Sequence, residues 1–239
     1  MHTIERIYPK DLDPHSTDDQ NTLRIHMERY EFAARQLHGQ RILDMACGCG
    51  YGTALLAERN PQRQVTGVDI DPAAIAYAQQ HYQLPNLRYV CADAERFAEE
   101  PFDSIVSLET IEHLPSPQRL IDNYARLLAE GGRVIASVPI TPTLDGNPHH
   151  LHDFSRRSFF ALFRQHGLRP HEHFEQIQWW QFKGLFSKRP DQAKQHRSEG
   201  VGNAVLLYYK RRPLYLFARL GSMLRYGFSN RYLTCSFQR

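Results

Sequence analysis

Short apolar runs alternate with helical spacings of apolar residues along the middle of this chain. The runs are RILDMA (41–46), QVTGVDI (64–70), LRYVCA (87–92), FDSIVSL (102–108) and GRVIASVP (132–139). Each has the length and the β-branched or aromatic content of a buried strand. Helices are expected after Thr53, over PAAIAYAQQHY (72–82) and over PQRLIDNYARLLAE (117–130). This order predicts a doubly wound, Rossmann-like α/β domain whose parallel sheet is covered on both faces.

The flanking segments extend this plan. A leading helix is expected over residues 17–38, ending before Gly39, and SRRSFFALFRQHG (155–167) starts with a serine that can cap a helix. HEHFEQIQWW (171–180) and NAVLLYYKR (203–211) are candidates for an antiparallel pair of strands. The polar stretch 181–203 between them suggests a lid-like insertion. We therefore expect one domain over residues 1–209 and a basic, aromatic extension over 210–239.

Composition narrows the class of protein. The chain has 239 residues, 41% of them hydrophobic and 23% charged, as in an ordinary globular protein. Its net charge of +3 is too small to indicate nucleic-acid binding by itself. Neither a leader pattern nor an apolar run of about 18 residues is present, so a cytoplasmic location is expected. The cysteines, Cys47, Cys49, Cys91 and Cys235, lack paired metal-ligand spacing and are expected to be reduced thiols.

A glycine-rich loop follows the first expected strand. Gly48, Gly50 and Gly52 stand at alternate positions, and Asp69 ends the second strand about twenty residues downstream, a distance at which a carboxylate can bond ribose hydroxyls. These features predict a nucleoside ligand. A dinucleotide fingerprint would need glycine in place of Thr53, and Asp44 would repel a pyrophosphate but suits a cationic amino group. S-adenosylmethionine meets both conditions.

Four stretches in order, ILDMACGCGYGT, VTGVDIDP, VCADAERF and FDSIVSLETIEHL, resemble the class I S-adenosylmethionine-dependent methyltransferases over roughly residues 40–140. The resemblance implies a seven-stranded sheet, mostly parallel, with an antiparallel closing strand. It also implies a set of cofactor-binding residues, in which Asp44 and the glycines surround the methionine moiety, Asp69 holds the ribose and Asp93 contacts the adenine. The full set is Asp44, Ala46, Gly48, Gly50, Asp69, Ile70, Asp93, Ala94 and Leu108.

Candidate catalytic groups follow the fourth and fifth strands. Glu109, Glu112 and His113 have the spacing E-x-x-E-H, which resembles that of the ubiquinone-pathway O-methyltransferases and the small-RNA 2′-O-methyltransferases. A helical turn there would bring all three onto one face. The loop after the fifth strand adds His149, His150, His152 and Asp153, which open on the same crevice.

Two mechanisms remain open for these groups. The expected catalytic residues are His113, Glu112, Glu109 and His150, with His113 as a general base. Alternatively, a divalent magnesium, manganese, iron or zinc ion is held by Glu109, Glu112, His113 and His149. Either route suits methyl transfer to a hydroxyl of a small molecule or glycan precursor. The alternatives are an RNA 2′-O-methyltransferase and a cofactor-binding regulator without turnover.

The C-terminal stretch 210–239 contains seven basic residues and no acidic one. Basic groups interleaved with Tyr, Phe and Leu suit an anionic membrane surface, a phosphorylated acceptor or RNA, although the low net charge disfavours nucleic acid. The same pattern is also typical of an amphipathic helix docked on the domain or on a second subunit. The sequence does not indicate an oligomeric state.

Overall fold

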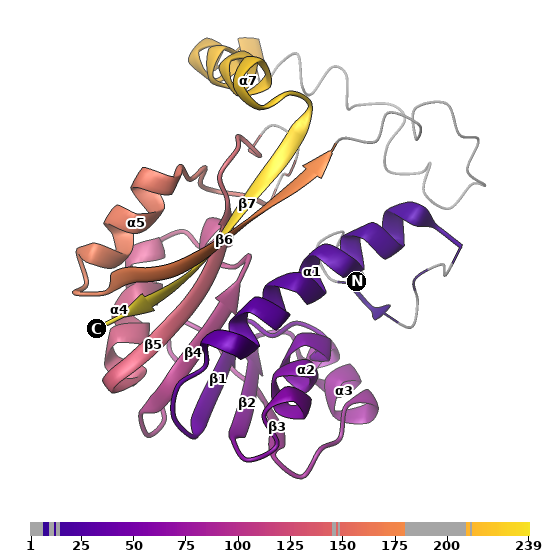
Figure 1. Ribbon diagram of the computed structural model, residues 1–239, viewed down its shortest axis with the longest axis vertical. Helices are drawn as coiled ribbons and strands as arrows, with labels where there is room; N and C mark the ends of the chain where they lie inside the picture. The colour runs from indigo at the N-terminus through magenta and orange to yellow at the C-terminus, as the bar shows by residue number, and fades with distance from the viewer. Residues whose placement is uncertain are drawn as a thin grey trace.

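The computed structural model of the chain describes residues 7–9, 12, 15–144, 147, 149–179, 209–210 and 212–239. Seven strands form one sheet in the order β3-β2-β1-β4-β5-β7-β6 (Figure 1). The strands are β1 (Arg41–Met45), β2 (Gln64–Asp69), β3 (Leu87–Cys91), β4 (Phe102–Leu108), β5 (Leu128–Pro139), β6 (Arg169–Trp179) and β7 (Ser229–Gln238). The first five are parallel, and β7 is antiparallel to both β5 and β6. The predicted Rossmann-like sheet is confirmed.

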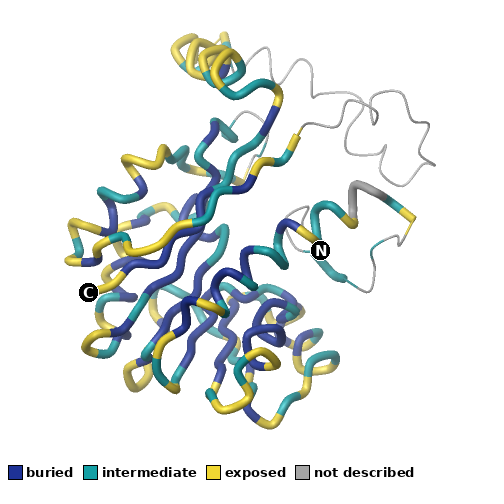
Figure 2. The backbone as a smooth tube through the Cα atoms, in the orientation of Figure 1, coloured by how far each residue is buried: buried dark blue, intermediate teal, exposed yellow. Residues whose placement is uncertain are grey.

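Helices cover both faces of this sheet. They are α1 (Thr17–Gln36), α2 (Tyr51–Arg59), α3 (Pro72–His81), α4 (Pro117–Leu127) and α5 (Arg156–Arg164). A short 3₁₀ turn, η2 (Ile111–His113), follows β4, and α7 (Pro213–Tyr226) lies at one end of the molecule (Figure 1). Neighbouring residues of a strand point to opposite faces, so Ile42 packs with α1 and α2 whereas Leu43 packs with α4 and α5. The central strands β1, β2, β4 and β5 are therefore largely buried from both sides, whereas the edge strands β3 and β6 are partly exposed (Figure 2).

The closing strand lies elsewhere than expected. β7 begins at Ser229 and is buried between β5 and β6, with Leu233, Cys235 and Phe237 fully buried. The prediction that 210–239 is an extension outside the domain is wrong for this strand, whose backbone is paired along both edges. Residues 203–208 of the predicted partner strand, and the insertion 181–203, lie outside the described residues.

A second difference is local. The helix expected over 117–130 ends at Leu127, and β5 begins at Leu128. Gly131 has φ +70°, a conformation that glycine adopts without strain, and Gly131 and Gly132 interrupt helical propensity at this point. The change moves no candidate site residue, because β5 still ends at Pro139 beside β4.

Two backbone outliers mark the edge where the parallel strands end. Among the described residues, Ala46 (φ 62°) and Glu109 (φ 51°) are the non-glycine residues with positive φ. Ala46 directly follows β1, and Glu109 directly follows β4, its neighbour in the sheet. A positive φ is strained for a non-glycine residue. Such residues adopt it where the surrounding structure enforces it, often at functional sites. The crevice between β1 and β4 is therefore the place to look for a site.

Candidate active site

The three glycines after β1 have different surroundings. A Cβ atom on Gly52 would lie 2.0 Å from the Tyr30 ring, and one on Gly50 would lie 2.6 Å from the Ala78 Cβ. At Gly48, which has φ +56°, a Cβ atom would meet no atom within 4 Å. Gly50 and Gly52 are therefore small because the protein itself packs against them. Gly48 exposes bare backbone to open space, as expected for contact with a ligand.

Asp69 joins this loop to the end of β2. Its Oδ2 accepts a hydrogen bond from the Gly48 N–H and its Oδ1 accepts one from the Asp71 N–H, both at 2.9 Å. Both oxygens of the Asp69 carboxylate therefore lie at the junction of the glycine loop and the end of β2. The neighbouring Ile70 is 64% exposed, an unusual state for isoleucine. This arrangement fits a ribose at Asp69 and an apolar ring face over Ile70.

Asp44 is buried behind the loop. Its Oδ2 accepts from the Thr53 hydroxyl (2.6 Å) and from the Tyr30 hydroxyl (3.2 Å). Burial raises the pKa of Asp44 to about 7, although the bonds from Thr53 and Tyr30 oppose that shift. A carboxyl in this state gains from a nearby cation, because the cation stabilises the ionised form. The environment agrees with the expected amino group but also gives Asp44 a structural role in holding α1 to α2.

The turn after β3 holds its shape through Asp93 and Ala94. The Asp93 Oδ1 accepts from the Glu95 N–H at 2.9 Å, and the Asp93 carbonyl accepts from Arg96 and Phe97. The Ala94 carbonyl accepts from the Asn123 side chain of α4 at 2.6 Å. The Asp93 side chain is 39% exposed. Its carboxylate is thus held by its own turn while remaining accessible to a ligand.

The E-x-x-E-H spacing predicted that Glu109 and Glu112 would share a helical face. In the structure they do not. The positive φ of Glu109 precedes η2 and turns its side chain toward β5, where Oε1 accepts a hydrogen bond from the Ser137 hydroxyl at 2.7 Å. Its Oε2 lies 3.6 Å from Nη1 of Arg29. Leu108, the last residue of β4, is partly buried against the cluster formed by α1 and α2. Glu109 is therefore an ion-pair partner at the floor of the crevice.

Arg29 is a site residue that the sequence prediction missed. It is 2% exposed, donates from Nε to Gln176 Oε1 of β6 at 2.8 Å and stacks on the Tyr232 ring of β7. Its signal in the sequence was an arginine at the i+4 position from Ile25, on the apolar stripe of α1. A buried guanidinium at such a position needs a carboxylate partner, and here that partner is Glu109.

The structure brings together Glu112, His113 and His150. One ligand atom from each lies within 4.8 Å of the others, and this is a group that could hold a metal ion. Glu112 is fully buried, and the His113 and His150 rings meet edge to face with centroids 4.6 Å apart. Glu109 and His149, both expected as ligands, do not belong to this group. His149 contributes its backbone carbonyl instead, which lies 3.2 Å from His113 Nδ1.

Hydrogen bonds orient both imidazoles. A carbonyl only accepts, so the contact with His149 places the proton of neutral His113 on Nδ1 and leaves the lone pair on Nε2. His150 Nδ1 lies 2.6 Å from the Thr143 hydroxyl, which donates to Asp153 Oδ1 at 3.2 Å. The Thr143 hydroxyl thus links the His150 ring to Asp153. Two oriented imidazoles beside a buried carboxylate suit proton acceptance or metal ligation.

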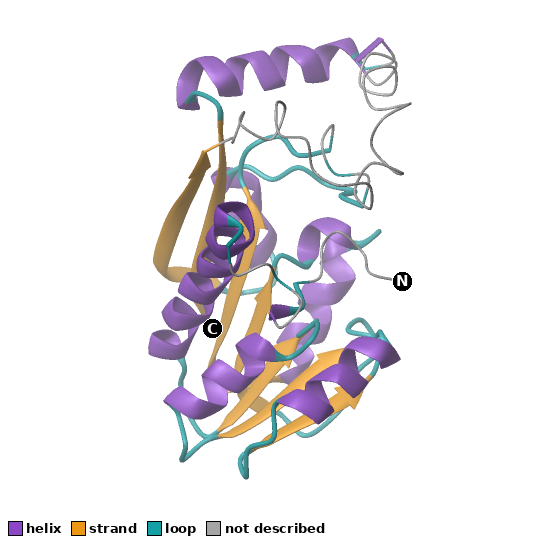
Figure 3. Cartoon of the chain, turned by 90° about the vertical axis from the view of Figure 1, so that its right-hand side faces the viewer, coloured by secondary structure: helices purple, strands orange, loops and turns teal. Residues whose placement is uncertain are grey.

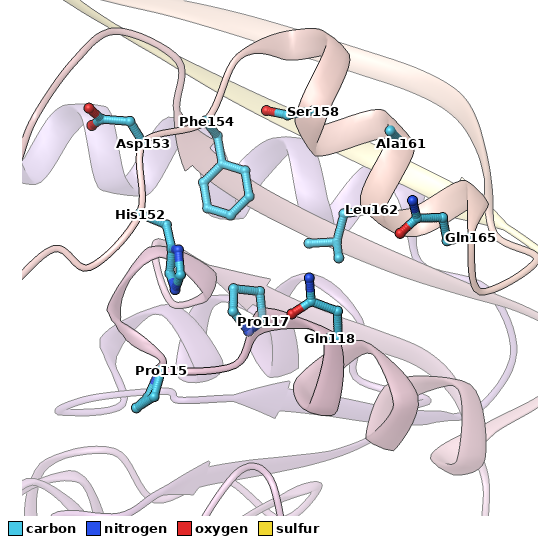
Figure 4. Close-up of a pocket in the computed structure, with 10 residues that line it drawn as sticks. All are labelled: Pro115, Pro117, Gln118, His152, Asp153, Phe154, Ser158, Ala161, Leu162 and Gln165. Carbon is cyan, nitrogen blue, oxygen red and sulfur yellow. The ribbon is translucent and has the colours of Figure 1, made fainter. Parts of the chain in front are cut away.

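The backbone joins the two loops that carry these side chains. The Glu112 carbonyl accepts from the Leu151 N–H at 2.8 Å and from the His152 N–H at 3.2 Å. His152 Nε2 lies 2.9 Å from the Leu114 carbonyl. A cavity of about 350 Å³ lies behind this junction, between α4 and α5 (Figure 4). It is lined by Pro115, Pro117, Gln118, His152, Asp153, Phe154, Ser158, Ala161, Leu162 and Gln165, and so includes none of Glu112, His113 and His150.

The four cysteines are free, as expected; Cys47, Cys49 and Cys235 are buried and Cys91 is exposed. Cys47 and Cys49 lie in the glycine loop, where burial raises the pKa of the Cys47 thiol well above its usual value. A buried thiol with a raised pKa is a poor nucleophile. These cysteines therefore have packing roles.

Residues 43–136 match the methyltransferase domain family. The chain is 35% identical over 130 residues to the phthiotriol/phenolphthiotriol dimycocerosates methyltransferase of Mycobacterium leprae, covering 53% of this chain and 47% of that one. It is 38% identical over 105 residues to the ubiquinone biosynthesis O-methyltransferase of Coxiella burnetii, covering 42% and 44% respectively. The chain thus spans about half the length of the curated relatives it matches.

A solved structure extends the likeness to most of the fold. Magnesium protoporphyrin IX methyltransferase from Synechocystis, crystallised with bound S-adenosylhomocysteine, superposes with a TM-score of 0.62 at 14% identity, covering 95% of this chain and 89% of that one. At that identity the likeness concerns the fold. Residues 43–136 therefore carry a methyltransferase domain, and they lie in a fold that this chain shares with a solved methyltransferase.

Proposed function

We propose that this protein transfers the methyl group of S-adenosylmethionine to a hydroxyl group of a small-molecule acceptor. The observation that carries the proposal is the group of Glu112, His113 and His150 in the loops after β4 and β5, in which one ligand atom of each side chain lies within 4.8 Å of the others. A hydroxyl is a weak nucleophile until its proton is removed, whereas a neutral amine is nucleophilic without deprotonation. The O-methyltransferase of Coxiella among the relatives supports the same class of acceptor.

S-adenosylmethionine supplies a methyl group on an already activated sulfonium, so the protein's task is positioning and proton removal. The exposed backbone at Gly48 and the carboxylate of Asp69 would hold the nucleoside end. Buried Asp44, with a pKa of about 7, would favour the cationic amino group. Glu109 stays fixed by Arg29 and Ser137 at the floor of the crevice.

Two routes for the proton are consistent with the geometry. In the first, His113 Nε2 accepts the proton of the acceptor hydroxyl, and the His149 carbonyl stabilises the resulting imidazolium through Nδ1. In the second, Glu112, His113 and His150 would hold a divalent ion, and such an ion would supply Lewis-acid chemistry that lowers the pKa of the hydroxyl. One carboxylate and two imidazoles match the donor preferences of zinc, iron and manganese better than those of magnesium.

Mass spectrometry with methyl-labelled S-adenosylmethionine tests the reaction. The protein is incubated with a metabolite extract, and the labelled product is fragmented to locate the methyl group. We expect the label on an oxygen atom. A label on nitrogen or carbon, or the absence of a labelled product when the protein binds S-adenosylhomocysteine, would contradict the proposal.

Calorimetry tests the cofactor separately. S-adenosylhomocysteine should bind, and NAD should bind far more weakly, because Thr53 occupies the position that a dinucleotide loop reserves for glycine. The Thr53 side chain also has a role inside the fold, because its hydroxyl donates a hydrogen bond to Asp44. Tight NAD binding would show that the loop has been misassigned.

A further inference from the structure

Helix α7 presents large apolar side chains to solvent. Leu214, Phe217 and Leu224 are 81%, 68% and 90% exposed, and Leu216 and Leu220 are also exposed. At 100° per residue, positions 216, 217, 220 and 224 fall on one side of the helix, with Leu214 at the edge of this side. We call these five residues the α7 apolar face. Burying such a face against an apolar medium is favourable, at about 25 cal/mol for each Å² removed from water.

Polar contacts fix the opposite side of α7 to the domain. The Tyr215 hydroxyl donates to Asp153 Oδ2 and accepts from the Leu144 N–H at 3.1 Å. Arg219, one turn further along the same side, is buried. These contacts turn the α7 apolar face outward. The sequence left open whether α7 docks on the chain's own domain through its apolar side. Among the described residues, the α7 apolar face is exposed instead.

More exposed apolar groups lie beside α7. Phe228 follows the helix and is 48% exposed, and Trp179 and Ile177, at the end of β6, are exposed as well. Trp179 pairs with Ser229 of β7 and would lie 3.5 Å from a Cβ atom on Gly227. Figures 1 and 3 show α7 at one end of the molecule, away from α2 and α3. The apolar groups therefore share one extremity of the protein.

The charged side chains of the segment that carries α7 have one sign. Residues 209–239 contain no aspartate or glutamate, and Lys210, Arg212 and Arg225 lie at the two ends of α7. Basic residues flanking an exposed apolar helix, with aromatic rings nearby, are typical of helices that lie in the interface of an anionic bilayer. No helix among the described residues is long and apolar enough to cross a membrane. We propose that α7, with Trp179 and Phe228, docks the protein on the surface of an anionic lipid bilayer.

The docking surface is connected to the candidate active site. Asp153, which accepts from Tyr215 of α7, also accepts from Thr143, and Thr143 contacts His150. β7 enters the sheet directly after α7, at the edge where the parallel strands end. α7 therefore lies on the crevice side of the sheet. The proposed docking does not depend on methyl transfer, and its test needs no acceptor.

Tryptophan fluorescence and vesicle flotation test the docking. The chain's two tryptophans are Trp179 and Trp180, so emission reports on this extremity. Vesicles of phosphatidylcholine mixed with phosphatidylglycerol should shift the emission to the blue and float the protein, and high salt should weaken both effects. Pure phosphatidylcholine vesicles should bind less. Failure to bind the anionic vesicles would overturn the proposal.

Matched variants separate the apolar from the ionic contribution. Phe217→Ala combined with Leu224→Ala should lower vesicle partitioning by at least about tenfold while keeping helix propensity. Arg212→Gln combined with Arg225→Gln should lower it by several-fold on anionic vesicles only. The control, Arg35→Gln combined with Arg157→Gln, removes the same charge from exposed positions on α1 and α5 and should leave partitioning unchanged.

Calorimetry with S-adenosylhomocysteine checks that each variant keeps a folded cofactor site. Equal loss of vesicle binding in the control variant would mean that net charge alone drives adsorption, which contradicts docking by α7. Size-exclusion chromatography supplies the remaining outcome. If the Phe217→Ala and Leu224→Ala variant is smaller than the wild type and vesicle binding is unchanged, the α7 apolar face joins two copies of this chain, and the proposal is wrong.

Discussion

The two halves of the crevice are built in different ways. On the β1 side, the contacts run between residues close in sequence or on adjacent strands, such as Gly48 with Asp69 and Thr53 with Asp44. On the β4 and β5 side, Glu109 is held by Arg29 of α1 and Ser137 of β5, and His150 is linked through Thr143 and Asp153 to Tyr215 of α7. The first half depends on local sequence, whereas the second depends on elements far apart in the chain.

This difference fits the two tasks that the proposed function requires. A cofactor of constant shape can be held by a short backbone motif. Acceptors differ, and a site made of side chains on loops can change without disturbing the sheet. The comparison predicts that substitutions on the β4 and β5 side alter turnover, whereas those on the β1 side alter cofactor affinity.

The largest effect is expected at His113. His113→Ala should lower turnover by about 10²–10⁴-fold, because the acceptor hydroxyl would lose its base or the ion a ligand. Affinity for S-adenosylhomocysteine should not change. The measurement is turnover of the acceptor identified by mass spectrometry, with calorimetry alongside. His173→Ala, on an exposed face of β6, is the control and should keep full activity.

A chelator then separates the two routes. If an ion works in the group, EDTA abolishes turnover, added divalent ion restores it, and Glu112→Gln is as severe as His113→Ala. If His113 acts alone, EDTA has no effect and Glu112→Gln is milder. Full activity of both variants would rule out both routes and leave positioning as the source of catalysis.

On the β1 side, Asp69 should dominate cofactor affinity. Asp69→Ala removes the ribose acceptor and leaves the Gly48 N–H without its carboxylate, so affinity for S-adenosylhomocysteine should fall by about 1.5–3 kcal/mol. Asp69→Asn keeps one acceptor oxygen and should fall less. Asp71→Ala is the matched control, because it removes the N-cap of α3 and costs stability rather than affinity. Equal affinity losses at both positions would contradict the assignment of the ribose site.

The glycine loop tests the comparison within a single motif. Gly52→Ala places a Cβ atom against the Tyr30 ring and should lower the free energy of unfolding by about 1–3 kcal/mol. Gly48→Ala meets no protein atom, so it should cost about 1–2 kcal/mol of backbone strain and, in addition, weaken S-adenosylhomocysteine binding. Denaturant unfolding and calorimetry give both quantities. If Gly48→Ala left affinity intact, no ligand would contact that backbone.

The sequence predicted the parallel strands more accurately than the antiparallel closing strand. β4 was predicted at its observed bounds, and β1, β2 and β3 within a residue, because buried parallel strands are continuous apolar runs. β7 was missed, although Leu233, Thr234, Cys235, Ser236 and Phe237 alternate between apolar and small polar residues, the period of a strand. The surrounding basic residues drew attention to charge instead. Pairing with β5 and β6 is a long-range contact that local composition does not report.

The catalytic group shows the same limit. Helical spacing predicted that Glu109 would join Glu112. Instead, Glu109 has a positive φ, which is rare for glutamate, and its side chain contacts Ser137 and Arg29. Which histidine of the loop joins the group depended on the backbone bonds from Leu151 and His152 to Glu112. Those bonds cannot be predicted from residue types. The sequence predicted the two loops that the structure brings together, but not which of their side chains would meet.

The smallest effect expected is on the pH dependence of stability, and it compares a partly buried group on α1, His26, with a buried group on β1, Asp44. Burial, aided by Arg29, lowers the pKa of His26 to about 3, and burial raises the pKa of Asp44 to about 7. Neutral His26 therefore stabilises the fold above pH 6.5, and this contribution is lost as the pH falls toward 3, because the unfolded state takes up the proton first. The protonated form of Asp44 stabilises the fold below pH 4, and this contribution is lost as the pH rises through 7.

Between pH 7 and pH 5 the two groups should thus oppose each other. On acidification, the free energy of unfolding of His26→Asn should rise by about 1–2 kcal/mol relative to that of wild type. That of Asp44→Asn should fall by a similar amount relative to wild type. Urea unfolding of the three proteins at both pH values measures this change in relative stability, and all other titrating groups cancel in the differences. Bound S-adenosylhomocysteine, if its ammonium lies near Asp44, should lower the pKa of Asp44. It should then reduce the change for Asp44→Asn and leave that for His26→Asn as it is. An equal change for both variants in the same direction would contradict the environments assigned to these two side chains.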